Sequence, residues 1–146
     1  MAIEWDVLIV EMTLLAGIIY GAVYLELWHY KRTQSNQEKQ ATKKIIVFIL
    51  SDLEKKLAFI HESIQYNDFK PFFTNMWDAV ILTNKQTLLS FEMFESLQAT
   101  YSWMKYYNTE LETKKQQNEE TLEELLDDVK KSIDQSLGLL REAKIT

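Results

Sequence analysis

The apolar run from Val7 to Leu25 constrains the fold of this chain more than any other feature. Its nineteen residues, VLIVEMTLLAGIIYGAVYL, contain a single charged side chain, that of Glu11. At 1.5 Å per residue, a helix of this length spans about 30 Å, the hydrocarbon thickness of a bilayer. The run therefore predicts one N-terminal transmembrane helix, within an anchor segment that covers residues 1–32.

The residues on either side of this run predict its orientation. Residues 1–30 carry four acidic residues and no Lys or Arg, whereas Lys31 and Arg32 follow directly. A secretory signal peptide begins with basic residues and ends at small ones, and this segment does neither. The positively charged flank of a span stays inside the cell. We therefore expect a single-pass helix in the cell (plasma) membrane, with the N-terminus outside and the C-terminal domain cytoplasmic.

Small and polar residues inside the run indicate contacts with other membrane proteins. Thr13, Gly17 and Gly21 form a stripe that contains GxxxG, which lets a second helix approach closely. Glu11 points roughly 80–160° away from this stripe at 100° per residue. Two alternatives stay open, because GxxxG also occurs by chance and a Glu near the membrane surface can snorkel to water. If both features are used, the helix contacts partners on two sides, which favours a hetero-oligomer over a simple homodimer.

The remainder of the chain, residues 33–146, is predicted to be a soluble all-α domain. The whole sequence has three Gly and one Pro, too few for a turn-rich β fold. Apolar residues recur every three or four positions, as they do on amphipathic helices. We expect helices near 36–66, 75–87, 91–112 and 119–143. Short connections between such helices favour a cytoplasmic up-and-down bundle of about four helices.

Capping residues and a polar connector support these boundaries. Thr74 and Ser90 stand where N-caps of the second and third helices are expected. Thr121 and Glu124 have the spacing of a capping box at the last helix. The polar residues 113–118 are predicted to connect the third helix to the fourth.

Aromatic residues gather in the middle of the soluble domain, and most are expected in its core. On the third helix, however, Tyr101 and Trp103 lie about 160° apart on a helical wheel. They cannot both share one face with Tyr106 and Tyr107, so at least one of these aromatics is expected at the surface. Tyr and Trp are favoured anchors at protein interfaces. Trp103, Tyr106 and Tyr107 are therefore the candidate residues for a protein-binding surface.

Patterns typical of catalysis or cofactor binding are scarce in this sequence. The chain has no Cys, which excludes disulfides, thiolate nucleophiles and cysteine metal sites. Glu26 and His29 form one ExxH pair, but a di-iron bundle needs two such pairs, and the other histidine, His61, follows Ala58. The 16 basic residues are spread among 18 acidic ones after residue 30, so no nucleic-acid-binding face is expected. We expect no catalytic residue, metal site or cofactor.

Two segments carry a resemblance to known proteins. The block PFFTNMWDA, beginning at Pro71, and the block YSWMKYYN, ending at Asn108, resemble a pattern in uncharacterised prokaryotic single-span membrane proteins with a small helical domain. The similar region covers roughly residues 45–112. More faintly, the whole layout resembles the small single-span accessory subunits of archaeal ammonia monooxygenase. That resemblance implies that the metal ligands lie in the large subunits and that this chain supplies none.

Together these features predict a non-catalytic, membrane-anchored accessory or scaffolding subunit of a larger membrane protein complex. Its expected partners are the lipid bilayer and other membrane protein subunits. A free-standing tethered adaptor, which recruits a soluble partner through an aromatic helical face, is the first alternative. An enzyme or small-molecule-binding bundle is the second.

Overall fold

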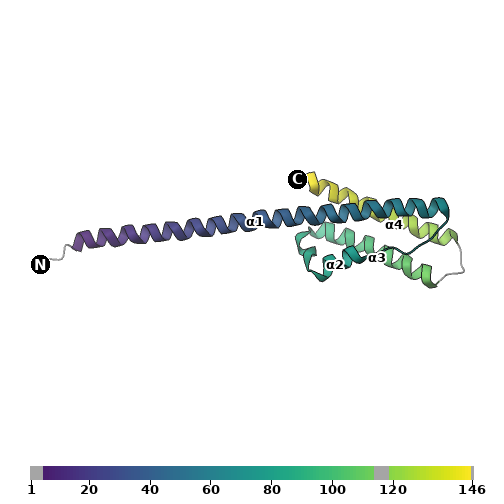
Figure 1. Ribbon diagram of the computed structural model, residues 1–146, viewed down its shortest axis with the longest axis horizontal. Coiled ribbons are helices and arrows are strands. Elements are labelled where there is room, and N and C mark those ends of the chain that lie inside the picture. The colour runs from purple at the N-terminus through teal and green to yellow at the C-terminus, as the bar shows by residue number, and fades with distance from the viewer. Residues whose placement is uncertain (1–4, 114–118, 146) are drawn as a thin grey trace. The chain divides into compact units, whose positions relative to one another are not determined.

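The computed structural model describes residues 5–113 and 119–145, and these residues are almost entirely helical (Figure 1). The all-α class is therefore confirmed. Within the described residues there are four α-helices and one short 3-10 helix: α1 (Trp5–Tyr66), α2 (Asn75–Leu82), η1 (Lys85–Leu88), α3 (Phe91–Thr113) and α4 (Glu119–Ile145). Most of the connector expected at 113–118 lies outside the described residues.

The chain divides into two units, the first ending at Gln40 and the second beginning at Ala41, and α1 contributes to both. In the first unit every described side chain is exposed, and only Gly21 is partly covered. Among the described residues, α1 is the one helix that is long and apolar enough to cross a membrane by length and composition. None of its most apolar window is buried by protein.

The second unit contains the hydrophobic core. One apolar stripe of α4 is buried along its whole length, because α4 turns this face to α1 and α3; it consists of Leu122, Leu126, Val129, Ile133, Leu137 and Leu140. Hydrogen bonds join Ser96 to Ser136 and Thr100 to Ser132, so α3 and α4 run antiparallel. The largest fully buried side chains come from α1, α2, α3 and α4: Ile49, Leu53, Ile60, Trp77, Leu97, Tyr101, Met104, Tyr107, Leu126, Ile133, Leu137 and Leu140.

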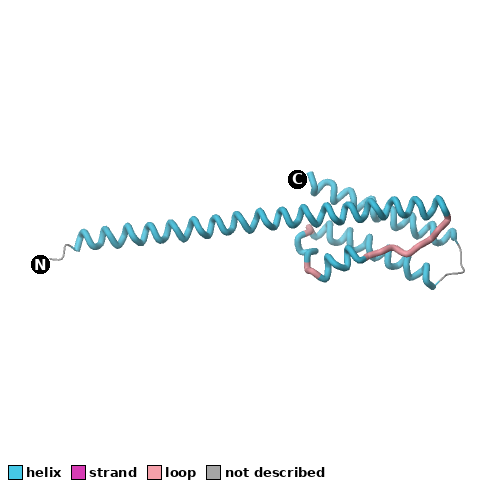
Figure 2. The backbone as a smooth tube through the Cα atoms, viewed as in Figure 1, coloured by secondary structure: helices cyan, strands magenta, loops and turns pink. Residues whose placement is uncertain are grey.

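The return from α1 to α3 differs from the expected helix over 75–87. Asn67, with a φ of 54°, ends α1, and residues 67–74 then cross the domain without helical structure, the long pink segment of Figure 2. In this segment Phe72 lies between the rings of Phe59 and Tyr107, with centroid distances of 5.1 and 5.2 Å. α2 then stops at Leu82, because Asn84 adopts a left-handed conformation with a φ of 56° that an α-helix cannot continue through.

One of the three expected caps is confirmed. The Ser90 hydroxyl accepts the Met93 N–H at 3.2 Å and so caps α3. Thr74 precedes α2, but its hydroxyl donates to Asp78 instead of accepting a backbone N–H, so it makes no side-chain cap. Thr121 lies inside α4, which begins two residues earlier at Glu119, and the predicted capping box there is wrong.

Candidate interaction surfaces

The apolar part of α1 has two distinct faces. Glu11 lies on one exposed face, among the apolar side chains of Leu8, Met12 and Leu15. Thr13, Gly17 and Gly21 lie on another side of the helix, roughly 80–160° around from Glu11. A Cβ placed on either glycine would meet no described atom within 4 Å, so this face is open to a close neighbour.

The two polar side chains of these faces differ in how they are satisfied. The Thr13 hydroxyl donates to the main-chain oxygen of Ile9 at 2.7 Å, so it needs no partner outside the helix. Within the described residues, no donor pairs with the Glu11 carboxylate. In an apolar surrounding, a carboxylate is costly unless it is protonated, paired or hydrated. Glu11 is therefore the residue of this helix that most demands an external partner or water.

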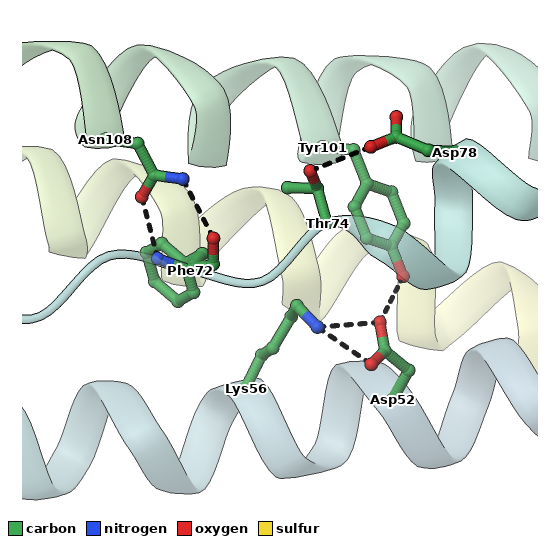
Figure 3. Close-up of polar contacts among 7 residues, drawn as sticks. All are labelled: Asp52, Lys56, Phe72, Thr74, Asp78, Tyr101 and Asn108. Carbon is green, nitrogen blue, oxygen red and sulfur yellow. Dashed lines mark hydrogen bonds and ion pairs between the residues drawn. The ribbon is translucent and has the colours of Figure 1, made fainter.

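A polar network lies inside the second unit between α1 and α3 (Figure 3). Lys56 Nζ contacts both carboxylate oxygens of Asp52 at 2.8 Å, and the Tyr101 hydroxyl donates to Asp52 Oδ2 at 2.6 Å. Burial raises the pKa of the Tyr101 hydroxyl well above its usual range, and the neighbouring Asp52 charge raises it further. This network joins α1 to α3 with every strongly polar group paired.

Trp77 adds an aromatic layer to the same region. Its ring stacks on Tyr101 with a centroid distance of 5.3 Å and an interplanar angle of 5°. Its indole Nε1 donates to Gln98 Oε1 at 3.0 Å. α2 is therefore fixed to α3 by a buried stacked pair, this hydrogen bond and an exposed ion pair between Lys105 and Asp78, which explains why so short a helix is held in place.

Asn108 fixes the extended segment to α3. Its side-chain oxygen accepts the Phe72 N–H at 2.7 Å, and its side-chain nitrogen donates to the Phe72 carbonyl at 2.9 Å (Figure 3). One amide thus satisfies both backbone groups of a residue that has no helix or sheet to do so. Asn108 closes the YSWMKYYN block, so this contact gives that asparagine a physical role.

The three candidate interface aromatics do not share one environment. Trp103 and Tyr106 remain at the surface, 39% and 50% exposed, and their rings form an edge-to-face pair with centroids 6.0 Å apart. Tyr107 is instead fully buried, which corrects the expectation that it belongs to a surface. Burial raises the pKa of its hydroxyl to about 12. Tyr107 fills the core because α3 packs on two sides, against Phe72 and against α4.

Hydroxyl groups line the contact between α3 and α4. The Thr100 hydroxyl is 2.8 Å from both Ser132 Oγ and Ser136 Oγ, and Ser96 Oγ is 2.7 Å from Ser136 Oγ. Each of these hydroxyls is bonded to another hydroxyl of the cluster. Such a cluster lets two helices approach closely and supplies no activated nucleophile, which needs an adjacent base.

Several of these residues were missed by sequence reasoning. Asp52 and Lys56 carry a recognisable signal, because they stand four residues apart at the edge of the apolar stripe of α1, the spacing of an ion pair on one helix. Asn108 ends the YSWMKYYN block, but its partner, the Phe72 backbone, has no signature in the side-chain pattern. No group of three or more His, Asp or Glu in the described part of the chain is arranged to hold a metal ion.

Comparisons with protein-family models, curated proteins and solved structures gave no match for this chain.

Proposed function

We propose that this protein is a non-catalytic, single-span accessory subunit of a larger membrane protein complex. The apolar part of α1 crosses the plasma membrane with its N-terminus outside, and the up-and-down helical bundle formed by the second unit is cytoplasmic. The observation that supports this proposal is the pair of faces on α1, one with Glu11 and one with Gly17 and Gly21. An ammonia-monooxygenase-like complex is the candidate assembly that the sequence resemblance favours.

A lipid bilayer does not distinguish between one apolar helix sequence and another. Lipid tails solvate any apolar side chain, so a helix used only as an anchor needs neither a glycine stripe nor a carboxylate. Glycine and glutamate both expose less apolar surface to lipid than a large apolar residue would. Glu11 also makes insertion of the helix into the membrane less favourable. A helix packed between other subunits uses both, because Gly17 and Gly21 admit a neighbouring backbone and Glu11 accepts a donor from the other side.

Substitutions on the two faces test this proposal. Gly17→Leu with Gly21→Leu fills one face, and Glu11→Leu removes the carboxylate from the other. We expect each variant to reach the membrane in normal amounts but to lose its co-purifying subunits in mild detergent. Val23→Ala serves as the control, because Val23 lies about 120° from both Glu11 and Gly17 on the helical wheel. Normal co-purification after replacement of Val7–Leu25 by a Leu/Ala helix would refute the packed-helix proposal.

The orientation has its own test. Protease added to cells stripped of their outer envelope should leave the helical domain intact, and permeabilised cells should lose it. Cleavage in intact cells would overturn the cytoplasmic assignment.

A second candidate function is favoured by the exposed Trp103–Tyr106 pair. As a free-standing tethered adaptor, the protein would bind a soluble partner through this pair. The same purification separates the two functions, because an adaptor would retain a soluble protein and no membrane subunit. That partner would be lost in the variant Trp103→Ala with Tyr106→Ala, and it would persist in the Glu11→Leu variant.

A further inference from the structure

One end of the second unit combines exposed apolar side chains with lysines. There the beginning of its α1 segment meets the end of α2, and the short turns flanking η1 lie nearby (Figure 2). Phe48 of α1 is 51% exposed and Leu82 at the end of α2 is 86% exposed. A hollow between them is lined by Phe48, Met76, Ala79, Thr83 and Lys85, which places residues of α1 and η1 side by side.

This surface is basic in a protein that is acidic as a whole. Residues 41–51 and 79–91 contain three lysines and no Asp or Glu, whereas the chain carries a net charge of −6. Lys44 Nζ lies 6.0 Å from the centroid of the Phe48 ring. Elsewhere, Lys105 and Lys131 pair with carboxylates, but no carboxylate in the described residues pairs with the three lysines here. We call this surface the basic–apolar end and define it by Lys43, Lys44, Phe48, Ile81, Leu82 and Lys85.

We propose that the basic–apolar end binds the anionic lipid headgroups of the membrane that α1 crosses. Lysines attract anionic lipids, and exposed Leu and Phe side chains enter the boundary between headgroups and acyl chains. Both requirements are met by this one surface. The proposal rests on the proposed membrane anchoring of α1, because Lys44 follows Trp28 by only 16 residues in the chain.

The absence of cysteine from the sequence makes a direct test simple. Leu82→Cys introduces a unique thiol for an environment-sensitive fluorophore in the full-length protein, reconstituted in phosphatidylcholine vesicles with or without phosphatidylglycerol. Lipids that carry a nitroxide in the upper acyl chain serve as quenchers. Tyr20→Cys reports insertion of the α1 helix, and Glu123→Cys on α4 reports an exposed position away from the basic–apolar end.

Charge variants show whether the lysines are responsible. The variant Lys43→Glu, Lys44→Glu, Lys85→Glu removes the basic charge, and Lys55→Glu, Lys130→Glu, Lys131→Glu is the matched control with the same change in net charge. Each lysine near an anionic membrane contributes about 1 kcal/mol, which changes the ratio of membrane-bound to unbound surface by about fivefold. Removal of three should therefore lower the ratio of bound to unbound surface on the order of 100-fold.

The expected result is nitroxide quenching at position 82 in anionic vesicles, loss of this quenching in neutral vesicles and in the first charge variant, and its retention in the matched control. Equal quenching at positions 82 and 123 would overturn the proposal, provided that position 20 is quenched. If position 20 itself is unquenched, the membrane anchoring has failed instead. The fluorescence of the label at position 82 could instead report an apolar environment without any quenching by the nitroxide lipids. That result would mean that protein covers this surface, and it would also overturn the lipid assignment.

Discussion

Replacement of Trp77 by alanine tests the packing that fixes α2 to the rest of the domain. Trp77 is 2% exposed, stacks on Tyr101 and donates a hydrogen bond to Gln98. Truncation of a buried Trp to Ala typically lowers the free energy of unfolding by about 3–5 kcal/mol. Loss of the stacked pair and of the partner for Gln98 places this substitution near the upper end, at about 5 kcal/mol.

Urea unfolding of residues 41–146, followed by circular dichroism, measures this loss. All buried apolar side chains of the described residues lie between Ile45 and Leu140, so this fragment keeps the core. With a slope of about 2 kcal/mol per molar urea, the midpoint should fall by about 2 M or more. Trp103→Ala is the matched control, because Trp103 is 39% exposed and should cost about 1 kcal/mol or less. Equal shifts for the two variants would refute the assignment of Trp77 to the core.

Two further predictions concern the polar interior. Burial holds the hydroxyls of Tyr101 and Tyr107 neutral in the folded state, because it raises their pKa values above the usual 10.0 and that of Tyr107 to about 12. The free energy of unfolding should therefore be intact below pH 10 and should fall as the pH rises toward 12. Tyrosinate absorbance from both residues should appear only as the domain unfolds. Asn108→Ala leaves both backbone groups of Phe72 unpaired and should cost about 2 kcal/mol. Asn108→Asp keeps the acceptor, so faster hydrogen exchange at the Phe72 amide should follow the first substitution only.

Helical periodicity predicted the elements that bury a single face. α4 packs with one stripe, in which apolar residues recur every three or four positions as on an amphipathic helix. α3 does not follow this rule, because it is enclosed by Phe72 on one side and α4 on another. Its buried arc therefore includes Thr100 and Tyr107 as well as Tyr101, and a one-face interpretation wrongly placed Tyr107 at the surface.

The path between α1 and α3 depended on interactions that periodicity does not encode. The early end of α2 results from the backbone conformation of Asn84, which many Asn residues do not adopt. The extended course of the segment through Phe72 results from one side-chain amide 36 residues away. The candidate interaction residues on α1 were found from the sequence because an apolar helix makes any polar or small residue conspicuous. The basic–apolar end was not, because it is assembled from two distant segments.

The two hydrogen bonds between the Asn108 side chain and the Phe72 backbone affect the order in which the domain can fold during synthesis. The apolar stripe of α1 begins at Ile45, and its last buried neighbour on α4 is Leu140, 95 residues later in the chain (140 − 45). Synthesis proceeds at roughly 5–20 residues per second, so the stripe waits roughly 5–20 s for a complete core. Neither α2 nor the extended segment can close earlier, because Tyr101 and Asn108, which hold them, are themselves made late. The apolar face of the nascent domain therefore stays incompletely covered until α4 has been made.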